Sequence, residues 1–140
     1  MALIDGRTRM EHLTPHACWE LLRAEAVGRI GVLVDSAPEI YPVSYAVDGE
    51  TIVFRTDPGT KLRAVDRSPS VCFEVDRVDP ADRTGWSVLI KGRAVELTSA
   101  ADLMTASELP LELWTSGDKS HWVRIVPAEI TGRRVGPAGR

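Results

Sequence analysis

Apolar and polar residues alternate along most of the chain, a pattern typical of β-strands with one buried face. The clearest example is the segment 71–76, where Val71, Phe73 and Val75 fall on the same side. Runs of β-branched and aromatic residues, which favour strands, mark the others. The predicted strands are 29–34, 40–47, 51–55, 71–76, 85–97 and 121–127, with 130–135 as an extension of the last.

Three segments show helical spacing instead. Thr14 followed by Pro15 is a typical N-cap and first helical position, and predicts a helix over 15–25. A second short helix is expected over 60–67, with Leu62 and Val65 directed inward. The sequence from Thr98 to Asp102 resembles a capping box and predicts a third helix that ends near residue 107.

Glycine and proline residues mark where the strands turn, bend or lie at an edge. Asp48-Gly49 is a hairpin signal that makes the flanking strands antiparallel. Pro42 cannot donate to a strand ladder and predicts an edge or a bulge, and Pro127 predicts an edge where the last core strand leaves the sheet. Gly92 lies inside an unusually long strand, so we expect a bulge or bend there that lets the strand curl.

Together these elements predict a mainly β, antiparallel fold with two or three short helices. Short links join the first four strands, which favours antiparallel pairing, and closure into a small barrel would remove exposed strand edges. We expect helices to pack on the barrel openings. The 140 residues form one domain, with an extended lead-in over 1–13, an ordered core over about 12–134 and a flexible tail over 136–140.

Composition narrows the class of protein. The chain is 44% hydrophobic, and its net charge of −3 and pI of about 5.6 argue against nucleic acid as the main partner. We expect no signal peptide, because the start of the sequence is polar, and no apolar run comes near the ~18 residues of a membrane helix. Cys18 and Cys72 lie in apolar contexts, and we expect both to be buried thiols. We therefore expect a soluble, cytoplasmic protein.

The stretch from Arg55 to Lys61, here named the phosphate turn, is the strongest candidate site. It joins a strand to a helix through Pro58-Gly59 and carries two cations and two threonines. The start of a helix offers unpaired N–H groups and a partial positive charge, which suit a phosphate. The alternative is a surface turn with solvated Arg55 and Lys61. The stretch is not a triphosphate-binding loop, since Phe54 stands where the first glycine of that motif would be.

Other polar and aromatic residues in strands are open to two interpretations. Trp86 and Trp122 offer flat faces for a planar ligand, or serve as core anchors. Arg124 lies in an otherwise apolar strand. If it points inward it needs a carboxylate, a phosphate or a polar ring edge as partner; otherwise it faces solvent. His12 and His16 have metal-like spacing but no third ligand nearby, so no metal site is predicted. No motif of a known hydrolase or redox-active dithiol is present.

The order of these segments resembles the pyridoxamine 5′-phosphate oxidase-like flavoproteins of the flavin/deazaflavin split-barrel superfamily. The resemblance covers about residues 12–134. It is carried by Gly-Arg-Ile-Gly-Val-Leu-Val at 28–34, Pro-Val-Ser-Tyr-Ala-Val at 42–47, Phe-Arg-Thr-x-x-Gly-Thr-Lys-Leu at 54–62, Val-Cys-Phe-Glu-Val-Asp at 71–76 and Gly-Trp-Ser-Val-Leu-Ile-Lys-Gly-Arg-Ala at 85–94.

The resemblance implies a six-stranded split β-barrel that forms a homodimer with two cofactor sites at its interface. The usual cofactor of such proteins is FMN, whereas some relatives use the deazaflavin F420 or bind haem. Matching positions then imply the cofactor-binding residues. The phosphate would be held by Arg55, Thr60 and Lys61, with Thr56 close by. The isoalloxazine edge would lie along Val43 and Ser44, and the ring or its ribityl chain would meet Trp86, Ser87 and Val88. The cofactor bound mainly by the other subunit would be reached by Trp122 and Arg124.

Departures from the family pattern limit what is predicted. No histidine follows Arg124 in the Arg-x-His arrangement of true pyridoxamine phosphate oxidases, and Thr60 stands where those enzymes commonly have arginine. Vitamin B6 oxidation is therefore not expected. In the predicted site Trp86 and Ser87 join the phosphate turn from the same chain. No acid or base stands out; Tyr45 and Ser87 are weak candidates for proton transfer.

The leading prediction is an FMN-dependent oxidoreductase acting on an unknown small molecule. One alternative is an F420-dependent reductase, whose longer acidic tail would need additional cations such as Arg63, Arg67 and Lys91. Another is a flavin- or haem-binding protein without turnover. A dimer with an empty site is the last, because fold does not fix function.

Overall fold

The computed structural model describes residues 3–5, 9–112 and 119–136 of the chain. Eight strands and three helices follow one another along these segments. They are β1 (Leu3–Asp5), β2 (Met10–His12), α1 (Pro15–Arg23), β3 (Val27–Val34), β4 (Ala37–Asp48), β5 (Thr51–Thr56), α2 (Thr60–Arg67), β6 (Ser70–Asp79), β7 (Thr84–Leu97), α3 (Ala100–Ser107) and β8 (His121–Val135).

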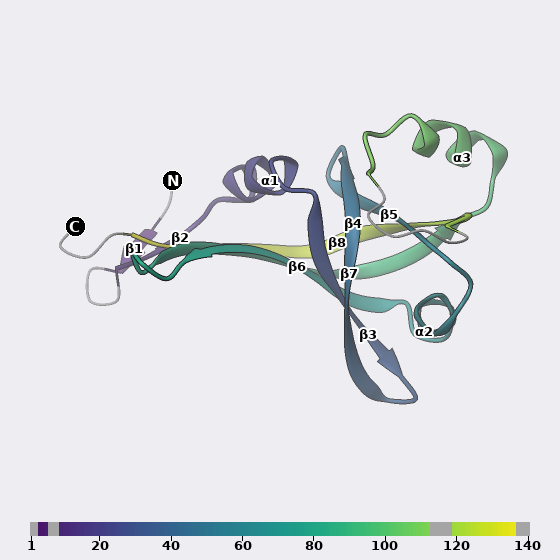
Figure 1. Cartoon of the computed structure of the whole chain (residues 1–140), viewed down its shortest axis with the longest axis horizontal. Helices are drawn as coiled ribbons and strands as arrows, with labels where there is room; N and C mark the ends of the chain where they lie inside the picture. Colours follow the sequence, from purple (N-terminus) through teal and green to yellow (C-terminus); the bar gives the residue numbers. More distant parts are fainter. Residues whose placement is uncertain (1–2, 6–8, 113–118, 137–140) are drawn as a thin grey trace.

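Six of the strands form a closed antiparallel ring. Hydrogen-bonded neighbours run in the order β8–β5–β4–β3–β6–β7, and β7 pairs with β8 to close the circle. The ring strands β6, β7 and β8 extend together beyond the other three, and β2 and then β1 pair onto the far half of β8 (Figure 1). The predicted mainly β, six-stranded antiparallel split barrel is confirmed.

A bulge lets the two longest strands curve around the ring. The register between β7 and β8 shifts between Lys91 and Gly92, at the glycine where the sequence predicts a bend. A Cβ atom at Gly92 would lie only 2.2 Å from the carbonyl oxygen of Val126, so the close approach of the strands requires glycine. Pro127 lies opposite Gly92, and β8 continues past it. The predicted edge is present, because Pro127 has a ladder partner only on its β7 side among the described strands, but the predicted exit is wrong, because β8 stays paired with β7 as far as Val135.

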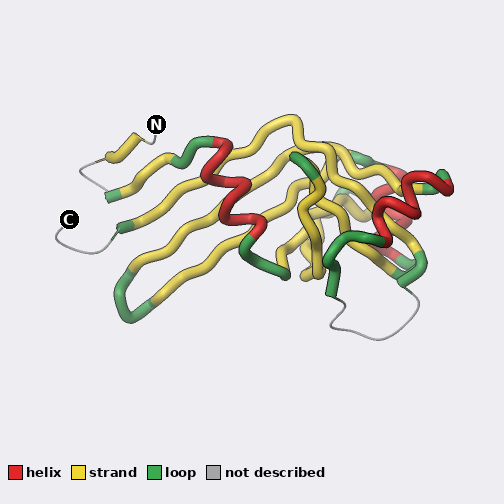
Figure 2. The backbone as a smooth tube through the Cα atoms, turned by 90° about the horizontal axis from the view of Figure 1, so that it is seen from above, coloured by secondary structure: helices red, strands yellow, loops and turns green. Residues whose placement is uncertain are grey.

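The barrel interior is apolar and tightly packed. Phe54 and Phe73 are fully buried, and the rings of Tyr45 and Phe73 meet edge to face with centroids 5.1 Å apart. Helix α1 lies across the strands (Figure 2) and buries Leu22, whose carbonyl accepts a hydrogen bond from the Tyr45 hydroxyl at 2.5 Å. Helix α2 packs on β3 and β7 and buries Leu62. The core thus fixes the position of α2, which begins at the phosphate turn.

A smaller apolar cluster holds α3 against the outside of the barrel. Val53, Leu97 and Ala106 are buried there, and Trp122 packs against them. Ser99 caps α3 by accepting a hydrogen bond from the Asp102 amide, as the capping box predicts. This cluster places Trp122 near the end of β5.

Some expectations about the chain need correction. Cys18 is buried, but Cys72 is exposed, because it faces outward on β6 between the inward-facing Val71 and Phe73. The lead-in is extended as expected, yet it includes two short strands that join the sheet. Of the expected flexible tail, residues 137–140 lie outside the described residues. Among the helices that the structure describes, none is long and apolar enough to cross a membrane.

Candidate functional site

The phosphate turn connects the end of β5 to the start of α2. Its N-cap residue is Gly59, which has no side chain to bond the first amides of the helix. The first N–H groups of α2 are therefore without a side-chain cap, and they add to the partial positive charge at this helix end. The local geometry is the one that the sequence predicts for an anion site.

Arg55 is held in place on one side of the turn. It lies directly opposite Trp122 in the β5–β8 ladder, and its guanidinium carbon is 4.9 Å from the centre of the Trp122 ring. Its Nε donates a hydrogen bond to the carbonyl of Lys119 at 2.8 Å. The remaining N–H groups of the guanidinium make no hydrogen bond to the described residues, so they are available to an anion.

Two lysines complete the cationic cluster. Lys119 Nζ lies 3.4 Å from Asp57 Oδ2, and this lysine lowers the pKa of Asp57 through a hydrogen bond and its charge. Lys61 is half-buried, with its Nζ 5.7 Å from the centre of the Tyr41 ring. Burial lowers the pKa of Lys61, the positive charge of Lys119 lowers it further, and Asp57 opposes both. A bound anion would offset the cost of holding these two ammonium groups together.

The two threonines of the phosphate turn differ in their availability. Thr56 is completely buried, and its hydroxyl donates a hydrogen bond to the Asp57 carbonyl at 3.2 Å. Thr60 is exposed at the first position of α2. Thr60 is therefore the threonine whose hydroxyl a ligand can reach.

Arg124 has its partners within its own chain. Its Nη1 lies 2.9 Å from Asp48 Oδ2 and donates to the Thr51 hydroxyl at 2.6 Å. The sequence left a carboxylate, a phosphate or a polar ring edge open as the partner of Arg124, and in the structure that partner is the Asp48 carboxylate. The pair joins β8 to the β4–β5 turn.

The predicted ring-contacting residues lie in other parts of the barrel. Val43 and Val88 face the core and are 6% and 1% exposed, whereas Ser44 is half-buried. Any contact of Val43 or Val88 with a ligand outside the barrel would have to come from the backbone.

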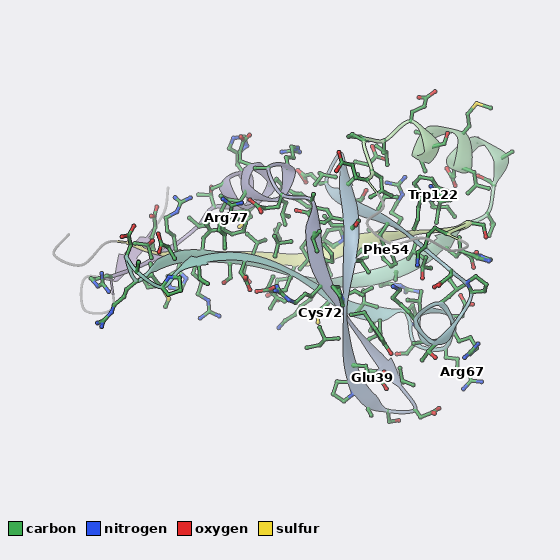
Figure 3. All side chains as sticks on the ribbon, in the orientation of Figure 1. Glu39, Phe54, Arg67, Cys72, Arg77 and Trp122 are labelled. Atoms are coloured by element: carbon green, nitrogen blue, oxygen red, sulfur yellow. The ribbon has the colours of Figure 1, made fainter. Side chains whose placement is uncertain are left out.

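Trp86 and Ser87 lie at the opposite end of β7 from the phosphate turn. On β7, Leu97 pairs with Trp122 beside the phosphate turn, whereas Trp86 pairs with Arg134. Trp86 precedes Leu97 by eleven residues, which is a path of roughly 36 Å along the strand. Figure 3 shows Trp122 and Arg77, the β6 residue that pairs with Trp86, in separate regions of the sheet. The expectation that Trp86 and Ser87 join the turn from the same chain is therefore wrong, whereas Trp122 contacts Arg55 of its own chain.

Three residues of the site were missed from the sequence. Asp57 lies within the turn itself, where a carboxylate between cations is a weak signal of charge compensation. Lys119 precedes β8 in an irregular stretch, and only the β5–β8 pairing brings it to the turn. Tyr41 reaches Lys61 because the pairing of β3 with β4 brings it toward α2.

The closed ring of six antiparallel strands, with a strand-to-helix turn rich in cations at one end, defines a split-barrel protein. The chain belongs to the pyridoxamine 5′-phosphate oxidase family, whose sequence model matches residues 14–134.

The chain also resembles individual proteins. The uncharacterized protein Rv3129 of Mycobacterium tuberculosis is 44% identical over 93 residues, which cover 65% of this chain and 83% of that protein. A solved FAD-binding protein from Mycobacterium smegmatis is 40% identical, with a TM-score of 0.76 over 89% of this chain and 97% of the other. A haem-binding protein from the same organism has a TM-score of 0.69 at 15% identity, covering 90% of this chain and 55% of the other, and shares the fold alone.

Proposed function

We propose that this protein is a flavin-dependent oxidoreductase for a small molecule, with the phosphate of the FMN moiety bound at the phosphate turn. The observation that carries the proposal is the convergence of Arg55, Lys61 and Lys119 on the uncapped start of α2. The family of the chain and its 40% identity to an FAD-binding protein support a flavin as the ligand.

The residues present fit a flavin phosphate. Three cations outnumber the single carboxylate of Asp57, and a phosphate ester favours charge-assisted hydrogen bonds of this kind. Stacking on Trp122 orients Arg55, the ion pair with Asp57 orients Lys119, and the exposed Thr60 adds a hydroxyl. A bound flavin would supply the redox chemistry, and the chain would bind and orient it.

We propose that two copies of the chain build each site. Trp86 and Ser87, which the family resemblance assigns to the flavin ring, lie farther along β7 from the phosphate turn than a flavin mononucleotide can span. A second copy in a two-fold dimer can bring its own Trp86 to the ring. The length of β7 thus supports a cofactor site at a homodimer interface.

Of the two weak candidates for proton transfer, Tyr45 is already engaged within the core. The Tyr45 hydroxyl already donates to the Leu22 carbonyl inside the core, and burial raises the pKa of Tyr45. Ser87 is half-buried and remains the residue to test.

We place the protein in the cytoplasm, where reducing conditions keep Cys18 and the exposed Cys72 as free thiols.

The first experiment identifies what the protein carries. The purified protein is denatured, the released small molecules are identified by mass spectrometry, and the stripped protein is titrated with FMN while flavin fluorescence is followed. A released flavin and saturable quenching support the proposal. A Soret band with released haem, or no change in flavin fluorescence on titration, would contradict it.

A further inference from the structure

A histidine and a glutamate form a short hydrogen bond at the end of the barrel where the phosphate turn lies. His121 Nδ1 is 2.7 Å from Glu96 Oε2, and the two side chains are 34% and 24% exposed. An ionised carboxylate has no proton to donate, so the Nδ1–H group of the imidazole is the donor. The pair is thus a directed bond that lies outside the cationic cluster of the phosphate turn.

The register of the strands places this pair on the inner side of the barrel. Thr56, the last residue of β5, pairs with His121, and Glu96 pairs with Val123. Paired residues share a face of the sheet, and Thr56 and Val123 are fully buried. Trp122 points the other way, toward the small apolar cluster under α3 (Figure 3). His121 and Trp122 therefore hold the start of β8 from its two faces.

The Glu96 carboxylate reaches β8 at the point where the β7–β8 ladder stops. The last described pair of these two strands is Leu97 with Trp122, and both His121 and Lys119 lie before it in the sequence. A segment at the end of a ladder opens more easily than one in its middle. The bond from Glu96 to His121 gives this segment a link to β7 beyond the ladder.

The same segment controls two of the three cations of the phosphate turn. The carbonyl of Lys119 accepts the hydrogen bond from Arg55 Nε at 2.8 Å, and Lys119 Nζ lies 3.4 Å from Asp57 Oδ2. The Lys119 side chain is 15% exposed, so its place depends on its surroundings. The ring of Trp122 lies 4.9 Å from the guanidinium carbon of Arg55. A shift of the segment would move Lys119 together with the groups that orient Arg55.

We propose that His121 and Glu96 are positioning residues for the anion at the phosphate turn. Their bond fixes the segment from Lys119 to Trp122, which presents one cation to the anion and orients another. The pair acts through this segment and does not touch the anion. Coupling between two sites of a protein typically changes an affinity by roughly 5- to 150-fold. The inference rests on the proposed function, because it takes a phosphate to lie at the turn.

The first test removes the bond and then restores it. His121→Ala removes the donor, whereas His121→Asn keeps an N–H donor near the position of Nδ1. We expect His121→Ala to bind inorganic phosphate and FMN about tenfold more weakly than the wild type, and His121→Asn to recover most of this loss. His16→Ala breaks the exposed pair of His16 with Glu20 on α1 and should change neither affinity. If His121→Ala binds like the wild type, or His121→Asn binds as weakly as His121→Ala, the inference is overturned.

An NMR measurement separates positioning from a general loss of structure. The Nε–H signal of Arg55 reports the hydrogen bond to the Lys119 carbonyl. It should shift in His121→Ala and return in His121→Asn, while the amide signals of the barrel core stay in place. If His121→Ala loses the core signals, Glu96→Gln replaces it, because glutamine keeps the size of the side chain and removes its charge. An unshifted Arg55 signal in the variant that binds weakly would overturn the inference.

Inorganic phosphate distinguishes this inference from the proposed function. If the wild type binds phosphate but not FMN, the proposed function fails, and the His121 variants are compared on phosphate alone. If the wild type and His121→Ala bind FMN equally well, the inference fails and the proposed function stands. A wild type that binds neither ligand would contradict both.

Discussion

At the scale of single residues, the candidate site holds the ammonium groups of Lys61 and Lys119 near each other despite their mutual repulsion. Lys61 is half-buried beside Lys119, and burial followed by repulsion lowers its pKa. Only Asp57 offsets this charge among the groups that shift the pKa of Lys61. Charge held at such a cost is typical of a functional site.

Replacing Lys61 with alanine should weaken binding of a phosphorylated flavin. A hydrogen bond to a charged group contributes about 1.5–3 kcal/mol, so the dissociation constant should rise roughly 10- to 100-fold. Fluorescence titration with FMN measures this effect. Arg23→Ala, on the exposed face of α1, is the matched control and should bind FMN like the wild type. If Lys61→Ala binds FMN as tightly as the wild type does, the assignment of the phosphate to this turn is wrong.

A second residue, Glu74, should make stability depend on pH. Its carboxylate lies 3.1 Å from Arg29 Nη1, and Asp76 shares the same nitrogen at 3.5 Å. Partial burial, then a hydrogen bond and repulsion from Asp76, raise the pKa of Glu74 to about 7, and Arg29 opposes the change. The folded state therefore binds the proton of the Glu74 carboxyl group more tightly than the unfolded state does. This proton binding stabilises the folded state fully at pH values below the ordinary pKa of 4.5, and the stabilisation is lost as the pH rises through about 7.

The Glu74→Gln variant tests this sign. Urea unfolding at several pH values should show the wild type losing stability relative to the variant as the pH rises from about 5 to about 8. A difference between wild type and variant that stays constant over this range would contradict the raised pKa.

At the scale of elements, the bulge of β7 allows the ring to close. Gly92→Ala would place a Cβ atom 2.2 Å from the Val126 carbonyl oxygen and 2.9 Å from the Pro127 Cα. Backbone atoms cannot move aside as side chains do, so we expect a loss of about 1–3 kcal/mol in the free energy of unfolding.

Gly59→Ala is the matched control for this prediction. An added Cβ at Gly59 meets no atom within 4 Å, and its φ of 172° is extended backbone open to any residue. Chemical denaturation should therefore show a near-neutral effect there. A Gly92→Ala variant as stable as Gly59→Ala would mean that the strands do not approach closely at the bulge.

The elements were largely predictable from the sequence because their signals are local. The cap at Thr14, the capping box at Ser99 and the bend at Gly92 each depend on a few adjacent residues. Arg55 and Lys61 were found because one short stretch contains both. Lys119 was not, because its contact with Arg55 joins residues 64 positions apart. The place of Trp86 depends on the full register of β7 against β8, which no local pattern specifies.

At the scale of the whole molecule, we propose that the site is divided between two copies of the chain. Lys61 and Trp86 lie near opposite ends of the barrel sheet, so one chain cannot apply both to one flavin. Variants Lys61→Ala and Trp86→Ala should each bind FMN weakly. Refolding them together should restore wild-type affinity in about a quarter of the sites, because half of the dimers are mixed and each holds one intact site. A mixture that binds no better than the two separate variants would contradict a shared site.

The central claim is that the phosphate turn recognises the phosphate of a flavin. The most direct measurement compares FMN with riboflavin, which differs only by lacking that phosphate, on the wild type and on Lys61→Ala. The wild type should bind FMN about tenfold or more tightly than riboflavin, and the variant should lose most of this preference. Equal binding of FMN and riboflavin by the wild type would contradict the account.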